Sequence, residues 1–210
     1  MSAPKEAITL RIPSKYASSS SPSPSFSPPP LDWLHRTWTV THSTLAMWRT
    51  ARNVRITYSP LPADPAGRAR IDDLVQYEKK TSGKAAVKTV QGVDTCSSPG
   101  EAGTASWDWR GKGLLAFVTS HWEVVGWGER DAAGGEGEGG GKERWAVTWF
   151  APTLFTKEGV DLYSDRKGGM SPALAADILA ALKGLGAEPL VRMVEADMKE
   201  VEVRLPWLEG

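Results

Sequence analysis

Four polar side chains lie in alternating apolar segments, where they could act as acids, bases or hydrogen-bond donors. They are His42, Tyr58, Tyr77 and His121. In an apolar pocket, an imidazole or a phenol can donate a hydrogen bond to a ligand carbonyl, and an imidazole can also move a proton. The alternative is that the histidines are satisfied by backbone at strand ends and the tyrosine hydroxyls meet solvent. We treat all four as candidate catalytic residues.

The chain contains ten tryptophans beside only four phenylalanines and four tyrosines. A buried indole must satisfy its N–H, so Leu, Ile, Val and Phe are the simpler residues for filling a core. Indoles on alternating segments therefore indicate a pocket wall. The residues predicted to line this pocket are Trp38, Val40, Trp109, Trp145, Val147 and Trp149. A tryptophan-rich core without a cavity is the alternative.

Three further residues are candidate ligand contacts. Trp48 follows a non-alternating link and is interpreted as a lid over the pocket, or as part of an ordinary packed loop. Arg110 alternates with the tryptophans of its segment, so it faces solvent if they face inward. If the register is shifted by one residue, Arg110 points into the barrel and could clamp an anion or a carbonyl group. Glu123 shares an alternating face with His121, but we do not expect the two to form a catalytic dyad.

Period-two alternation predicts an antiparallel β protein, either a meander closing into a barrel or a sandwich. The predicted strands cover residues 36–43, 52–59, 71–79, 86–95, 106–110, 114–120, 121–128, 144–151 and 160–164. After them, Ser171 and Pro172 begin an amphipathic helix that Gly184 ends. Whether residues 188–200 form a second short helix, with an extended piece after it, is left open.

The two ends of the chain differ in composition. Residues 18–30 read SSSSPSPSFSPPP, which disfavours both helices and sheets, so residues 1–30 are predicted to be an unstructured tail. A ligand for an SH3-type domain and an organelle transit peptide are the alternatives for this tail. Residues 31–210 are predicted to form one domain, with a flexible glycine-rich loop at 131–142.

Composition excludes several functional classes. Twenty-five basic residues balance twenty-five acidic ones, so no overall field favours binding to nucleic acid or to an anionic membrane. Cys96 is the single cysteine, and the three histidines lack metal-ligand spacing, so no metal or cofactor is expected. No apolar run is long enough for a membrane span, and no secretory signal is evident, so a cytoplasmic protein is predicted. The oligomeric state is not determined by the sequence.

Several long blocks resemble the small fungal lipocalin-like proteins of the calycin superfamily. The blocks are LHRTWTVTHSTLAMWRTARNVRITYSPL, IDDLVQYEKK, VKTVQGVDT, WDWRGKGLL, SHWEVVGWGE and WAVTWFAPTLFTKEGVDLYSDRKGG. The resemblance covers residues 31–169 and implies an up-and-down β-barrel of about eight strands with one C-terminal helix packed outside. Lipocalins usually begin with Gly-x-Trp where this chain has Arg36-Thr37-Trp38, which argues against classical extracellular transport.

The resembled group includes pericyclases of pyrrocidine-type polyketide and amino-acid hybrid biosynthesis. The resemblance therefore implies a barrel that binds a hydrophobic polyketide-derived intermediate and promotes an intramolecular cycloaddition without a cofactor. Such catalysis is physically reasonable, because aligning the two reacting ends can remove ~7 to 11 kcal/mol of the barrier. A non-catalytic intracellular carrier or sensor of a small hydrophobic ligand is the alternative.

Overall fold

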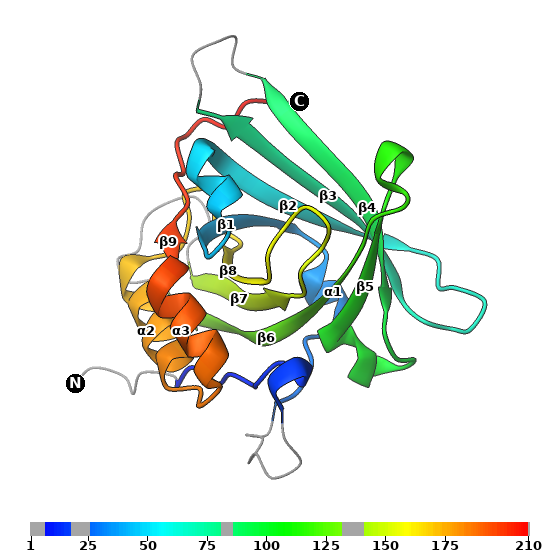
Figure 1. The fold of residues 1–210 in the computed structure, drawn as a ribbon, viewed down its shortest axis with the longest axis horizontal. Coiled ribbons are helices and arrows are strands. Elements are labelled where there is room, and N and C mark those ends of the chain that lie inside the picture. The colour runs from blue at the N-terminus through cyan, green and yellow to red at the C-terminus, as the bar shows by residue number, and fades with distance from the viewer. Residues whose placement is uncertain (1–6, 18–25, 81–85, 132–140, 210) are drawn as a thin grey trace.

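A closed antiparallel barrel dominates the computed structural model, which describes residues 7–17, 26–80, 86–131 and 141–209 (Figure 1). Within these residues eight strands form the barrel: β1 (Thr37–Ser43), β2 (Ala51–Leu61), β3 (Arg70–Lys79), β4 (Val87–Cys96), β5 (Ser106–Gly111), β6 (Thr119–Asp131), β7 (Lys142–Phe150) and β8 (Gly159–Ser164). Consecutive strands are neighbours, and β1 closes the barrel by pairing with both β2 and β8. The short strand β9 (Lys199–Glu200) pairs with β1 outside the barrel. The predicted barrel of about eight strands is confirmed.

The connections between strands are divided between two ends of the barrel, because successive strands run in opposite directions. Four connections share one end, which we call the mouth: those between β1 and β2, β3 and β4, β5 and β6, and β7 and β8. The first contains the 3₁₀ helix η2 (Ala46–Thr50), and the third contains η4 (Gly113–Leu115). Figure 1 shows the connections from β1 to β2, from β5 to β6 and from β7 to β8 around this end of the barrel.

A tryptophan cluster fills the opposite end of the barrel. The one-turn helix α1 (Leu31–Leu34) precedes β1 there. The Trp33 ring packs against those of Trp38 and Trp127, each at a centroid distance of 4.9 Å, and Trp38 Nε1 donates to the Leu34 carbonyl at 3.1 Å. This end is therefore plugged by packed indoles, so any cavity must lie toward the mouth.

Two helices cover the outside of the barrel: the one predicted from Ser171 and Pro172, and a second one in the stretch that the sequence left open. They are α2 (Pro172–Lys183) and α3 (Glu188–Asp197). Ser171 caps α2 as expected by accepting a hydrogen bond from the Leu174 amide at 3.4 Å. The second helix forms because Leu190 and Val194, one turn apart, both bury against the barrel wall. The outer face of β6 to β8 is therefore a second apolar layer, separate from the interior.

The N-terminal segment packs against the barrel, so the prediction of an unstructured tail over residues 1–30 is wrong for residues 7–17 and 26–30. Leu10 is buried in a bridge with Gly126, and the Arg11 amide donates to the Val125 carbonyl at 2.8 Å. The sequence Ile8-Thr9-Leu10-Arg11-Ile12 alternates like a strand, which explains its docking on β6. Residues 1–6 and 18–25, like 132–140 of the predicted glycine-rich loop, lie outside the described residues.

The predicted strand at 114–120 is also wrong. Gly113 adopts a left-handed φ of 58° and starts a compact turn, in which the Val118 amide donates to the Leu115 carbonyl at 2.8 Å. As a result β6 starts only at Thr119, and the side chains of Leu114 and Phe117 project from the mouth into solvent.

Candidate functional site: a cavity in the mouth half of the barrel

A cavity of about 360 Å³ opens at the mouth. Its walls are mostly apolar and come from all eight barrel strands except β1: Ile56, Val75, Val90, Trp109, Val118, Trp122 and Phe150 are among the lining residues. Leu45, Met47, Leu115 and Phe155 line it from the mouth loops. Cavities of this size and polarity hold small organic ligands in many proteins.

The wall of this cavity contains a buried carboxyl group, that of Asp73 on β3. Asp73 Oδ1 has no hydrogen-bond partner among the described residues. Burial raises the pKa of Asp73 to about 7, the charge of Asp72 adds to the rise, and the Trp109 indole N–H opposes it. Near neutral pH a large share of the group is therefore still protonated, and this carboxylic acid form can donate a hydrogen bond to a ligand.

A second carboxyl group, that of Asp161 on β8, reaches the same cavity. Ser43 Oγ donates to Asp161 Oδ1 at 2.5 Å. Burial raises the pKa of Asp161 to about 7, although the Ser43 hydrogen bond and the charge of Arg49 act in the opposite direction. The cavity thus has two carboxyl groups that are poised between their acid and base forms near neutral pH.

Aromatic and phenolic groups form the floor of the cavity. The ring of Tyr58 stacks on Trp122 at 5.6 Å with an interplanar angle of 7°. Burial raises the pKa values of Tyr58 and Tyr163 well above the usual range of a phenol, so both hydroxyls stay protonated. Trp122 Nε1 donates to Asp94 Oδ1 at 2.7 Å, and burial together with the nearby Asp73 raises the pKa of Asp94.

The arrangement suits one kind of chemistry better than others. Neutral acids and phenols in a mostly apolar chamber can polarise a ligand carbonyl or transfer a proton. Among the described residues, no group of three or more His, Cys, Asp or Glu side chains is placed to hold a metal ion. None of the described helices is long and apolar enough to cross a bilayer.

Of the residues predicted from the sequence, Tyr58 and Trp109 line the cavity. Trp38 and Val40 face the interior as expected, but they belong to the packed core outside the cavity lining. Trp48 and Tyr77 pack edge to face at 5.2 Å near the mouth and do not contact the cavity either.

The predicted positions of Trp145, Val147 and Trp149 are wrong. All three face outward and are buried beneath α2 and α3. Alternation correctly put them on one face of β7, but both faces of this strand are apolar, so the pattern did not show which was interior. The inward positions are taken by their neighbours, among which Thr148 and Phe150 line the cavity.

His42 also lies outside the cavity. The strand register shifts between Val40 and His42, so the alternation that should have placed both inside is interrupted by a bulge. His42 Nε2 lies 4.0 Å from Glu200 Oε1 of β9, and burial lowers the pKa of its imidazole. The bulge leaves no role for His42 as a donor to a ligand in the cavity.

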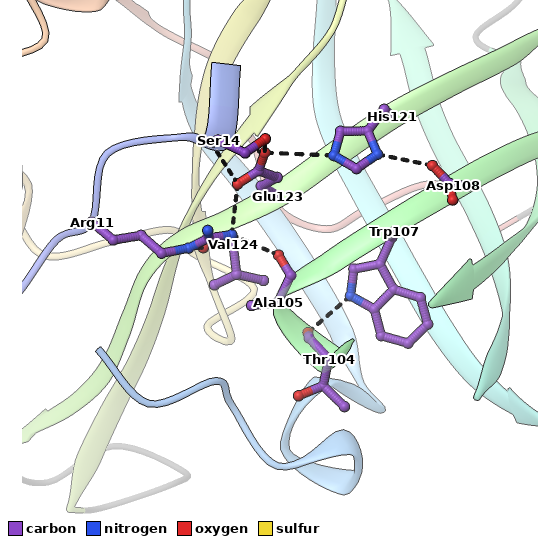
Figure 2. Close-up of polar contacts among 9 residues, drawn as sticks. All are labelled: Arg11, Ser14, Thr104, Ala105, Trp107, Asp108, His121, Glu123 and Val124. Atoms are coloured by element: carbon purple, nitrogen blue, oxygen red, sulfur yellow. Dashed lines mark hydrogen bonds and ion pairs between the residues drawn. The ribbon is translucent and has the colours of Figure 1, made fainter. Parts of the chain in front are cut away.

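His121 and Glu123 face the outer surface of β6, where they hold the N-terminal segment (Figure 2). Arg11 Nη2 lies 2.8 Å from Glu123 Oε2, and the Ser14 amide donates to Glu123 Oε1 at 3.1 Å. His121 Nε2 lies 3.5 Å from Glu123 Oε1, and its Nδ1 lies 2.8 Å from Asp108 Oδ1. His121 and Glu123 therefore share a strand face, as the alternation predicts, and they form an ion pair outside the cavity. That they form no catalytic dyad stays a prediction.

The electrostatics of this group indicate a structural clamp. Burial alone would raise the pKa of Glu123, but hydrogen bonds from His121 and Ser14 and the charge of Arg11 lower it. The hydrogen bond to Glu123 in turn raises the pKa of His121. Arg110 is likewise outside the barrel, where it donates to the Ala116 carbonyl at 3.1 Å, so it is no clamp for a ligand within.

Sequence reasoning missed Asp73, Asp161, Tyr163 and Trp122 as site residues. One signal was available: Asp73 interrupts an otherwise apolar alternating face formed by Ile71 and Val75. A carboxyl group at such a position is buried together with its apolar neighbours, unless the wrong face of the strand has been taken as the interior one. Comparison with models of protein families and with characterised proteins finds no match for this chain.

Proposed function

We propose that the barrel binds a small, largely apolar molecule carrying a carbonyl group and promotes its intramolecular cycloaddition in the biosynthesis of a polyketide-derived metabolite. One observation carries the proposal: an unpartnered oxygen of the buried Asp73 carboxyl in the wall of a mostly apolar cavity of about 360 Å³. The resemblance of residues 31–169 to fungal lipocalin-like pericyclases supplies the reaction class.

The chemistry requires two contributions from the protein. The apolar walls hold the two reacting ends of a flexible chain close together, which lowers the entropic part of the barrier. The Asp73 carboxylic acid donates a hydrogen bond to the carbonyl of the electron-poor partner, whose oxygen gains charge in the transition state. A donor placed in this way typically contributes about 10²- to 10³-fold in rate.

The test uses extracts of the source organism with its gene deleted as the supply of substrate. Purified protein should convert an accumulated linear compound into a product of unchanged mass and altered chromatographic retention. Asp73→Leu should slow this conversion about 10²-fold, because it replaces the donor by an apolar side chain of similar size. Asp72→Glu is the matched control, because Asp72 is the next residue on β3 but interacts with Lys112 and Gln91 instead, and glutamate keeps the charge that contributes to the raised pKa of Asp73.

The pH dependence of the reaction rate shows whether Asp73 acts as an acid or only forms part of the cavity wall. The rate should fall as the pH rises through about 7, where the Asp73 carboxyl loses its proton. Asp73→Asn keeps an N–H donor at every pH, so its profile should be flat in this range. Binding of the linear compound without conversion by the wild-type protein would refute the proposal and identify a carrier.

A further inference from the structure

The mouth of the barrel has a concentration of exposed apolar side chains. Among the described residues six large apolar side chains are exposed, and five of them belong to the mouth loops. They are Met47, Leu114, Phe117, Leu154 and Phe155, with exposed fractions of 42%, 93%, 66%, 80% and 67%. Their gathering at one end is not explained by folding, since each leaves its apolar surface in water.

These side chains come from three separate loops around one opening. Met47 lies in η2, Leu114 and Phe117 lie between β5 and β6, and Phe155 lies between β7 and β8. The rings of Phe117 and Phe155 meet edge to face at 6.5 Å, so two of the loops touch. Met47 and Phe155 also line the cavity. The exposed apolar rim is therefore continuous with the interior.

The charged residues at this end are predominantly basic. Within the described parts of the four mouth connections and the two strand residues beside each, the basic residues are Arg49, Arg52, Lys79, Lys80, Lys88, Arg110, Lys112 and Lys157. The acidic residues there are Glu78, which is held by Arg52 and Asn53, and Glu158, which is held by Lys15, Tyr16 and Trp149. Lys80 and Lys112 pair with Glu202 and Asp72.

Three of these lysines form no salt bridge within the described residues: Lys79, Lys88 and Lys157. All three are exposed. A chain with no net charge thus presents unpaired positive charge at its open end.

We propose that the mouth docks on a lipid bilayer containing anionic lipids, with Leu114, Phe117, Leu154 and Phe155 inserted between the headgroups and Lys79, Lys88 and Lys157 above the anionic surface. Protruding single side chains on separate loops suit insertion among mobile lipids. A protein interface of the usual kind would need a flatter, packed core. Docking in this orientation opens the cavity directly onto the bilayer, where an apolar ligand is concentrated.

Membrane docking by the mouth can be tested independently of the proposed reaction, because binding to vesicles is measured without any substrate. Full-length protein is sedimented with vesicles of phosphatidylcholine alone and of phosphatidylcholine mixed with phosphatidylserine. We expect strong binding to the anionic vesicles, weak binding to the neutral ones, and loss of binding at high salt.

Charge reversal tests the lysines. Each basic residue near an anionic membrane contributes about five-fold in binding, so Lys79→Glu with Lys157→Glu should weaken it by about 30-fold or more. The matched control is Lys183→Glu with Arg192→Glu, two exposed basic residues on α2 and α3.

Insertion is tested with a fluorophore on a single introduced cysteine. Cys96 is fully buried, so Leu154→Cys can be labelled selectively with an environment-sensitive dye. Its emission should shift to the blue when anionic vesicles are added, whereas a dye at Leu205→Cys, the exposed apolar residue away from the mouth, should not respond. Absence of vesicle binding, equal loss in both charge-reversal pairs, or no shift at position 154 would each overturn the proposal, and the first would point to a protein partner.

Discussion

Replacing Asp161 by Asn should remove a large part of the pH dependence of stability. Burial raises the pKa of Asp161 from 3.8 to about 7. One pKa unit corresponds to about 1.4 kcal/mol, so ionising the carboxyl in the folded protein costs about 4 kcal/mol more than in the unfolded chain. Because the folded pKa is raised, its stabilising effect is complete below about pH 4 and is lost as the pH rises to about 7.

The assay is urea unfolding of the wild-type and Asp161→Asn proteins at about pH 5 and pH 8, where the linkage relation gives a change of roughly 2.5 kcal/mol in their stability difference. With a urea slope of about 2 kcal/mol per M, the gap between the two midpoints should change by about 1.2 M. The wild type should be less stable relative to Asp161→Asn at the higher pH, since only the wild type must ionise a buried group at this position. All other titrating groups are shared, so they cancel. An unchanged gap would show that Asp161 ionises at its ordinary pKa, and the reasoning from burial would fail.

Three further outcomes follow from the packing. Gly92→Ala should destabilise the barrel by about 1 to 3 kcal/mol and displace Trp109, because a Cβ at this position would lie 2.2 Å from the indole Nε1. Urea unfolding measures the loss of stability, and ligand titration measures the change in the cavity wall. Wild-type values in both assays would contradict the clash. The Cys96 thiol should not react with a disulfide reagent at mildly alkaline pH until the protein unfolds, because burial raises its pKa to about 11; rapid native reaction would contradict this. Arg11→Met should destabilise the protein by about 1.5 to 3 kcal/mol, since it leaves the buried Glu123 carboxylate with only its His121 and Ser14 partners. A protease should then cleave the N-terminal segment faster, and unaltered stability and cleavage would exclude the clamp.

The strands were predictable because most of them alternate between an apolar and a mixed face. Eight of the nine predicted segments lie mainly within barrel strands. The ninth failed at Gly113, where a left-handed backbone makes a turn that an apolar pattern does not record. For Trp107 and Trp109 the sequence left two registers open, and the structure turns both indoles inward and leaves the intervening Asp108 exposed.

The interior face was not predictable where both faces of a strand are buried. On β7 the outer tryptophans pack under two helices, and the helices lie far along the chain from the strand. A local pattern holds no information about such a cover. The bulge that turns His42 outward is equally invisible, since one extra residue leaves no mark in composition.

The carboxyl groups of the cavity are the part of the site that sequence patterns hide most effectively. Hydrophobic periodicity assigns aspartate to the solvent side, yet Asp73, Asp94 and Asp161 are all buried. Asp94 and Asp161 accept hydrogen bonds from Trp122 and Ser43, but at Asp73 an apolar residue of similar volume would avoid the cost of burying an oxygen without a partner. Asp73 Oδ1 and Asp94 Oδ2 even lack partners within the described residues. A barrel built only for stability would not carry this cost of about 4 kcal/mol at Asp161 alone above neutral pH. The proposed function would account for these carboxyls, because a ligand oxygen in the cavity would satisfy the Asp73 acid that the fold leaves without a partner at Oδ1.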